Sequence, residues 1–325
     1  MFLKNSWYVA GWSKDYQKEL RAQMLLGERI VFYRRLDGLP VALEDACPHR
    51  KLPLSEGKLE GDQIVCGYHG KQFNTCGKFS FMPKTEGMLN FPSDVDNLSS
   101  IDLSKWNKFI FVSIDPIIPF NLIIQDMSKR ISWLPVEDFN FRKDLSKEYF
   151  IDANWALYCD NYLEGFHIPF IHEDLNSVLN YKDYEVEIFP YSNLQIGYGK
   201  NQDDCFDLPD SSPDFGGNIA AYYFWLFPNI MMNFYPWGLS MNIITPLSFN
   251  KTRVEFRSYV WNKELLNTGA GADVNKVELE DQEIINRVQS GINSRLYKSG
   301  RFSPQMEKGV HHFHRLIQRF MNSTL

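Results

Sequence analysis

Short apolar runs separated by turn residues dominate the first part of the chain. These runs are rich in β-branched and aromatic residues, and glycine-containing turns such as Asp37-Gly38 and Cys76-Gly77 stand between them. The pattern predicts strands over Gln23–Leu26, Ile30–Arg34, Val41–Leu43, Ile64–Cys66 and Phe109–Ile114. We therefore expect a small all-β domain over residues 1–115.

The pattern changes within residues 116–135, and helical and strand patterns are mixed beyond that point. One helix is expected to begin near Ala153, and two more cover residues 277–297 and 304–321. Aromatic-rich runs between them predict strands over Leu194–Tyr198, Tyr222–Leu226, Ile230–Phe234, Met241–Ile244 and Arg253–Trp261. Strands followed by long terminal helices indicate an α+β domain, which we place at residues 116–325.

Composition and charge narrow the class of protein. Of the 325 residues, 44% are hydrophobic and 23% are charged, as in a globular protein. The net charge of −6 provides no basic surface for a nucleic-acid backbone. The sequence predicts neither a membrane span nor a secretory signal. Five cysteines without a CxxC pair favour reduced thiols or metal ligands in the cytoplasm.

Two cysteines and two histidines are grouped in the predicted all-β domain. Cys47 and His49 lie in one Pro-containing loop, and Cys66 and His69 lie in a second, Gly-containing loop. Zinc binds a Cys₂His₂ set, but zinc fingers pair like with like. A Rieske [2Fe-2S] cluster instead carries two thiolates on one iron and two imidazoles on the other. The mixed pairs favour the cluster, because each loop then contributes one ligand to each iron.

A second group of metal-ligand side chains follows Ala153. Asp160, Glu164 and His167 are spaced i, i+4 and i+7, which predicts that they share one helix face. Pro169 is expected to end this helix, so that His172 can turn back beside His167. Two imidazoles in that arrangement can bind one metal ion, and Glu164 and Asp160 are candidate catalytic residues beside it.

A carboxylate would complete the two-histidine, one-carboxylate triad of Fe(II) oxygenases. Asp281 falls in the middle of a helical apolar stripe, whereas Glu280 lies roughly a quarter-turn away. The stripe comprises Val277, Ile284, Ile285, Val288 and Ile292. Because a buried carboxylate needs a cation or hydrogen-bond donors, we expect Asp281 to be the third ligand and Glu280 to be the alternative.

The sequence resembles the oxygenase (alpha) subunits of the Rieske non-haem iron oxygenases. The stretch from Asn5 through both Cys/His motifs resembles vanillate O-demethylase-type members, and Glu280-Asp281 with Gln289-Ser290-Gly291 resembles the ligand helix of the family. The tail that carries His311, His312 and His314 is similar to that of choline- and betaine-type members. The resemblance implies one [2Fe-2S] Rieske cluster, one mononuclear Fe(II), and a helix-grip (START-like) catalytic domain with an antiparallel sheet.

The resemblance also implies a route between the two metals. In the family, a carboxylate three residues before the first iron histidine bridges that histidine to a Rieske histidine across a subunit boundary. Glu164 holds this position, and by that mapping it would contact His167 and the His69 of a neighbouring chain. This implies a head-to-tail homotrimer, because a heterologous contact must close to stay finite.

Lys51 and Lys71 depart from the residues usual after the two motifs. Both are outside the ligand set, so we expect them to affect only surface or donor-docking details. The histidines of the tail are expected to serve packing or an interface. Cys76, Cys159 and Cys205 are expected to be inert thiols.

Together these observations predict a terminal oxygenase. It would use O₂ and NAD(P)H electrons from a separate reductase or ferredoxin, because no flavin or nicotinamide fingerprint is present. We expect it to hydroxylate or oxidatively demethylate a small aromatic or quaternary ammonium molecule, either of which suits the aromatic runs at residues 222–225 and 233–237. The alternatives are an aromatic ring cis-dihydroxylating dioxygenase and a non-catalytic Rieske electron carrier.

Overall fold

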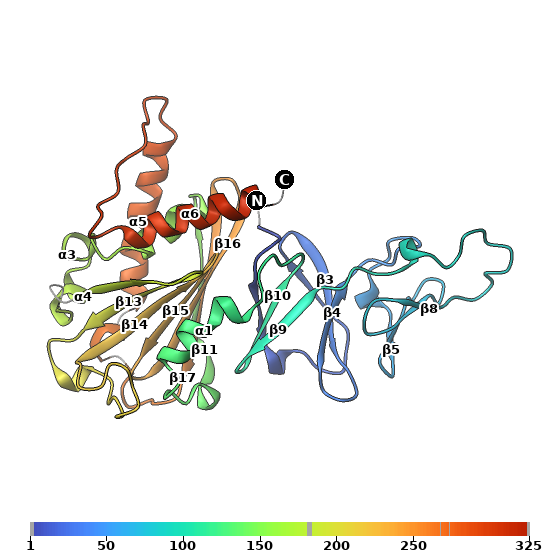
Figure 1. Ribbon diagram of the computed structural model, residues 1–325, viewed down its shortest axis with the longest axis horizontal. Helices are drawn as coiled ribbons and strands as arrows, with labels where there is room; N and C mark the ends of the chain where they lie inside the picture. Colours follow the sequence, from blue (N-terminus) through green and yellow to red (C-terminus); the bar gives the residue numbers. More distant parts are fainter. Residues whose placement is uncertain (1–2, 181–183, 267, 273, 324–325) are drawn as a thin grey trace. The chain divides into compact units, whose positions relative to one another are not determined.

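The chain folds into two compact units in the computed structural model, which describes residues 3–180, 184–266, 268–272 and 274–323. The first unit covers residues 3–118 and the second covers residues 119–323 (Figure 1). Strands dominate the first unit, and the second combines one large antiparallel sheet with helices. This confirms the predicted α+β class. Among the described residues, the helices lack the combination of length and apolar character that crossing a membrane requires.

Three small antiparallel sheets build the first unit, in the strand orders β1-β10-β9, β2-β3-β4 and β5-β6-β7-β8. Strand β3 lies between two hydrophobic cores, because Val31 and Tyr33 pack into one core and Ile30 and Phe32 into the other. This explains its unbroken apolar run. The strands are β1 (Tyr8–Trp12), β2 (Arg21–Leu25), β3 (Glu28–Arg34), β4 (Pro40–Glu44), β5 (Lys58–Glu60), β6 (Gln63–Val65), β7 (Gln72–Phe73), β8 (Phe79–Phe81), β9 (Asp102–Trp106) and β10 (Phe109–Ser113).

The second unit contains a seven-stranded antiparallel sheet in the order β11-β17-β16-β15-β14-β13-β12. Both faces of its interior strand β14 are covered. Trp225 packs against Phe313, whereas the neighbouring Tyr222 packs against Phe206 on the other face. The strands are β11 (Asn140–Ile151), β12 (Glu185–Ile188), β13 (Ser192–Tyr198), β14 (Ile219–Leu226), β15 (Ile230–Tyr235), β16 (Gly238–Ser248) and β17 (Lys251–Val260).

Helices and the connections between them pack around this sheet and carry the candidate metal ligands. The helices are α1 (Asn121–Arg130), α2 (Trp155–Tyr162), α3 (Ile168–Ile171), α4 (Glu173–Val178), α5 (Val274–Ile292) and α6 (Lys308–Asn322). Helix α2 contacts α5, α6 and strand β16. The two long C-terminal helices, drawn in orange to red in Figure 1, therefore hold α2 against the sheet.

Strand β11 and the end of α2 differ from the sequence-based expectations. The twelve residues of β11 form an edge strand whose side chains are mostly exposed, so no apolar alternation marks it in the sequence. Helix α2 ends at Tyr162, well before Pro169, which lies inside α3 instead. The expectation that Asp160, Glu164 and His167 share one helix face was therefore wrong.

Substitution of Phe313 tests how α6 packs within the second unit. Its side chain is 1% exposed and its ring lies edge-on to Trp225 and Trp155. We expect Phe313→Ala to lower the free energy of unfolding by about 3–5 kcal/mol, because a buried aromatic ring leaves a cavity. Urea unfolding followed by tryptophan fluorescence measures this change. Met321→Ala on the same helix is the control, since Met321 is 51% exposed; equal unfolding midpoints for both variants would contradict the packing described.

Candidate metal centres

Two loops in the first unit share one backbone geometry. In each loop the N–H of the cysteine donates to the carbonyl five residues later, from Cys47 to Leu52 at 2.9 Å and from Cys66 to Lys71 at 2.8 Å. Each cysteine carbonyl also accepts the N–H four residues later, and that residue has a positive φ in both loops, 60° in the first and 69° in the second. Two equivalent turns thus present two cysteines and two histidines.

The side chains of the two loops form a thiol pair and an imidazole pair. Cys47 and Cys66 are each 2% exposed, and their thiols lie within hydrogen-bonding reach of each other. Burial raises the pKa of the Cys47 thiol. The rings of His49 and His69 lie 4.6 Å apart between centroids, on the more exposed side. A buried thiol pair and a separate imidazole pair fit a [2Fe-2S] cluster with unlike ligands on its two irons.

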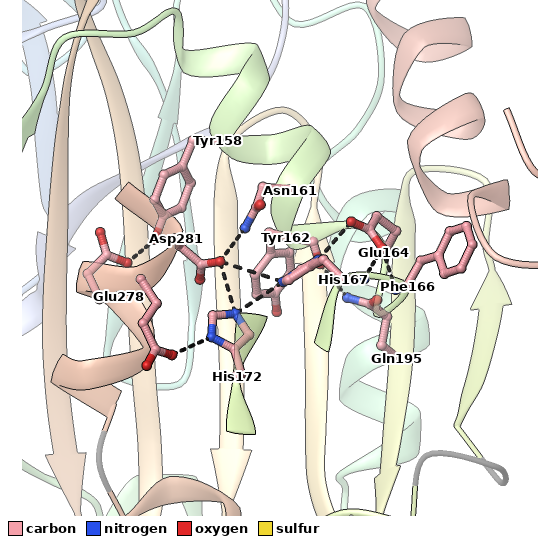
Figure 2. A network of polar contacts seen from close by, with 11 residues as sticks. Tyr158, Asn161, Tyr162, Glu164, Phe166, His167, His172, Gln195, Glu278 and Asp281 are labelled. Atoms are coloured by element: carbon pink, nitrogen blue, oxygen red, sulfur yellow. Dashed lines mark hydrogen bonds and ion pairs between the residues drawn. The ribbon is translucent and has the colours of Figure 1, made fainter. Parts of the chain in front are cut away.

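The second group comes from the connection after α2 and from helix α5. His172 Nε2 lies 3.2 Å from His167 Nε2 and 3.1 Å from Asp281 Oδ1, and His167 Nε2 lies 3.5 Å from Asp281 Oδ1 (Figure 2). Bonds of about 2.1 Å place adjacent octahedral ligands about 3.0 Å apart. Within the described residues, these three side chains form a group whose ligand atoms lie close enough together to hold one metal ion, and their types fit a mononuclear iron.

Each member of the triad is held by a further polar side chain. Glu164 Oε1 lies 2.7 Å from His167 Nδ1, and Glu280 Oε2 lies 2.7 Å from His172 Nδ1. The Asn161 amide donates to Asp281 Oδ1 at 2.6 Å. Because both Nδ1 atoms face carboxylates, both Nε2 atoms point toward Asp281 (Figure 2). Carboxylates in this position fix the ring orientation and the tautomer of metal-binding histidines.

Glu280 and Asp281 occupy different places around His172. Asp281 faces the Nε2 atoms of both histidines, whereas Glu280 contacts only His172 Nδ1. Burial opposes a charge on the His172 ring, but the two carboxylates overcome this and raise its pKa. The geometry therefore places Asp281 in the triad and gives Glu280 an orienting position.

A pocket of about 100 Å³ adjoins the triad. None of the described residues that line it is a lysine or an arginine. Glu278 also lines it, is 2% exposed, and accepts from the Tyr158 hydroxyl at 2.5 Å. Burial raises the pKa of Glu278 to about 8. The aromatic lining residues are Tyr158, Tyr162, Tyr184, Tyr223, Tyr235 and Phe256.

The sequence did not predict where the side chains of Glu278, Asn161 and Lys71 lie in the structure. Glu278 lies three residues before Asp281 on the same helix, so the argument that selected Asp281 could have found it. The buried face of α5 is centred on Glu278, Ile285 and Gln289, and Val288 from the expected apolar stripe is 45% exposed. Lys71 is only 2% exposed, so the expectation of a surface role was wrong.

Asp160 and the tail histidines lie away from the triad. Asp160 Oδ1 is 2.9 Å from His314 Nε2 on α6, and Asp160 is not among the residues that line the pocket. His312 Nδ1 lies 2.6 Å from Asn193 Oδ1, and His311 packs against Phe302. The three tail histidines thus make contacts away from the triad. The structure does not bring Asp160 to the metal centre, because α2 ends before it can align Asp160 with His167.

Comparison with known proteins agrees with both centres. Residues 133–323 match the ring hydroxylating alpha subunit (catalytic domain) family, and residues 6–92 match the Rieske [2Fe-2S] domain. The chain belongs to the ring-hydroxylating alpha-subunit family. It is therefore a Rieske-type terminal oxygenase, an oxidoreductase that incorporates O₂ and receives electrons from a separate donor. The family binds one [2Fe-2S] cluster and one mononuclear iron, and the alternative of a non-catalytic electron carrier was wrong.

Two relatives and two solved structures show how far the similarity extends. The chain is 29% identical to chloroplastic choline monooxygenase of Arabidopsis thaliana, over 96% of this chain and 76% of that protein. It is 28% identical to the carnitine monooxygenase oxygenase subunit of Escherichia coli (strain K12), over 90% of this chain and 81% of that protein. A quaternary ammonium Rieske monooxygenase shares the fold with a TM-score of 0.75 at 20% identity, over 98% of this chain and 90% of that one. Apo dicamba monooxygenase shares the fold with a TM-score of 0.64 at 20% identity, over 99% of this chain and 98% of that one.

Proposed function

We propose that this oxygenase oxidises a small quaternary ammonium compound. The observation that carries the proposal is the aromatic pocket beside the triad, which contains the buried carboxyl of Glu278 and no lysine or arginine among its described lining residues. Rieske domain 1–115 and catalytic domain 116–325 are part of the same proposal. Relatives that match most of this chain are a choline monooxygenase and a carnitine monooxygenase oxygenase subunit.

The two centres receive their ligands from this chain. In the proposal, Cys47, Cys66, His49 and His69 hold the [2Fe-2S] cluster, and a second set of His167, His172 and Asp281 holds the iron. A mononuclear iron held on one face leaves positions open, and when bound it supplies the activation of O₂. The ligand spacing and the buried thiols support this assignment.

Carboxylates around the triad control the protons of its ligands. The Nδ1–H of His167 is held by Glu164, and the Nδ1–H of His172 is held by Glu280, so each Nε2 lone pair is free to bind a metal ion. Asn161 donates to Asp281 and thereby fixes the orientation of its carboxylate. These contacts keep the ligand set in place during turnover.

Glu164 also offers a route for electrons between subunits. Glu164 contacts His167, and the exposed rings of Phe166 and Phe170 lie near it in the sequence and present apolar surface. In the first unit, Tyr68 is 61% exposed and stacks on His69. We propose that these two surfaces meet in a head-to-tail homotrimer in the cytoplasm. For one similar structure, inter-subunit electron transfer has been described.

Charge in the pocket favours a cationic substrate over a carboxylated aromatic one. Burial without a cationic partner raises the pKa of the Glu278 carboxyl. A quaternary ammonium group beside it would lower that pKa and favour the carboxylate, and the surrounding aromatic rings would attract the cation through cation–π contacts. A methoxybenzoate would instead bring a carboxylate toward Glu278 and Asp281, with no basic side chain in the described lining to pair with it.

Glu164→Gln tests the coupling of the two centres. We expect the variant to keep both metals but to lose product formation by about 10- to 100-fold, because the amide no longer provides the carboxylate contact to the imidazole. Oxygen uptake and product are measured together with iron content. Glu173→Gln, an exposed carboxylate in α4, is the control. Unchanged turnover in Glu164→Gln would remove Glu164 from the electron route.

A substrate panel tests the proposed chemistry. With a surrogate reductase, we expect choline or a related quaternary ammonium compound to drive oxygen uptake with stoichiometric product.

Glu278→Gln should raise the KM for that compound about tenfold, since a charge contact contributes about 1.5 kcal/mol. Glu283→Gln is the control, because its side chain is 63% exposed on the same helix. Coupled turnover of a methoxybenzoate alone, or a cis-diol product, would contradict the proposal.

A further inference from the structure

Lys71 is a buried cation beside the cluster loops. Its side chain is 2% exposed, and its Nζ lies 2.7 Å from Asp96 Oδ1. The rings of Phe73, Phe79 and Phe91 surround the ammonium, with centroids 5.9, 5.2 and 5.5 Å from Nζ. The ammonium is thus held in place by one carboxylate and three aromatic faces.

The fold does not need a charge at this position. Lys71 closes its loop by accepting the N–H of Cys66, just as Leu52 accepts the N–H of Cys47 in the equivalent loop. The side chain of Leu52 packs against the hydrophobic core of the first unit. An apolar residue therefore satisfies the same geometry in the twin loop, and loop closure does not explain a lysine.

Stability does not explain the lysine either. Removing a charge from water costs several kcal/mol, and replacing a buried ion pair with apolar residues of similar size is often neutral or stabilising. The pair formed by Lys71 and Asp96 is such a case, because the Asp96 side chain is also only 17% exposed. We therefore expect the charge to act on the proposed cluster site next to it.

Lys71 belongs to the loop that supplies two of the proposed cluster ligands. It follows His69 by two residues, and its carbonyl accepts the N–H of Cys66 at 2.8 Å. Because the ammonium is buried, little water screens its charge. A charge fixed on this loop therefore lies close to both ligands that the loop supplies.

We propose that the buried ammonium of Lys71 raises the reduction potential of the [2Fe-2S] cluster held by the two loops. The inference rests on the proposed cluster ligands. Reduction brings one electron from the external donor to the cluster, and a fixed positive charge nearby stabilises the added negative charge. The step transfers one electron and no proton. Because the pair is buried, dissolved salt screens it far less than it screens surface charges.

Two variants with opposite expected shifts test the proposal. The reduction potential is measured by spectroelectrochemical titration of the purified, iron-loaded chain at one fixed pH. We expect Lys71→Met to lower the equilibrium constant for one-electron reduction about tenfold, which is about 59 mV. Asp96→Asn should raise the potential, because it removes the opposing charge. A general loosening of the loops would move both variants in the same direction and would overturn the proposal.

Control variants separate this inference from the proposed function. Lys78→Met removes a lysine that is 63% exposed in the same unit, and Lys71→Arg keeps the charge; both should retain the wild-type potential. If Lys71→Met keeps its cluster absorption but matches Lys78→Met in potential, the inference is wrong. If Lys71→Met binds no cluster, the reduction potential of Asp96→Asn tests the inference instead. A raised potential would support it, and an unchanged or lowered potential would overturn it. A wild-type chain without [2Fe-2S] absorption would instead refute the proposed cluster.

Discussion

The structure depends on one contact, in which the Asp281 carboxylate meets the Nε2 atoms of His167 and His172. The ligand atoms come from two segments separated by more than 100 residues, yet they lie 3.1 to 3.5 Å apart. This requires α5 to stay packed on α2, and α2 to stay packed on the sheet. Tyr158 of α2 and Glu278 of α5 share a buried hydrogen bond that links the two helices beside the triad. The large sheet and the C-terminal helices therefore serve as a rigid support for three side chains.

Negative charge is concentrated around the two imidazoles in the interior of the second unit. Asp281, Glu280, Glu164 and Glu278 all lie around the two imidazoles, and this concentration of carboxylates is costly without cations. A metal ion in the triad and a cationic substrate in the pocket would each offset part of that cost. In the first unit the situation is reversed: the buried cation Lys71 lies in one of the two proposed cluster loops, and a cluster there would gain negative charge on reduction.

The sequence predicted which side chains come together better than it predicted their local structure. Residue type and spacing selected His167, His172 and Asp281, because few residue types can bind a metal and a buried Asp needs a partner. Helical periodicity failed after Tyr162, where Glu164 bonds the backbone of His167 and the chain leaves the helix. Strand β11 was missed because an exposed edge strand lacks an apolar alternation. The burial of Lys71 depends on Asp96 and Phe91, 20 or more residues further along the chain, as well as on the nearer Phe73 and Phe79, and local patterns cannot reveal that these groups meet.

Metal analysis tests the central contact most directly. The purified wild-type chain should contain about three irons and two acid-labile sulfides, two irons in the cluster and one in the triad. Asp281→Ala should lose one iron and keep the visible spectrum of the cluster, whereas Asp160→Ala, whose side chain contacts His314 instead, should keep all three. Retention of three irons in Asp281→Ala would contradict the account, and so would loss of the third iron in Asp160→Ala.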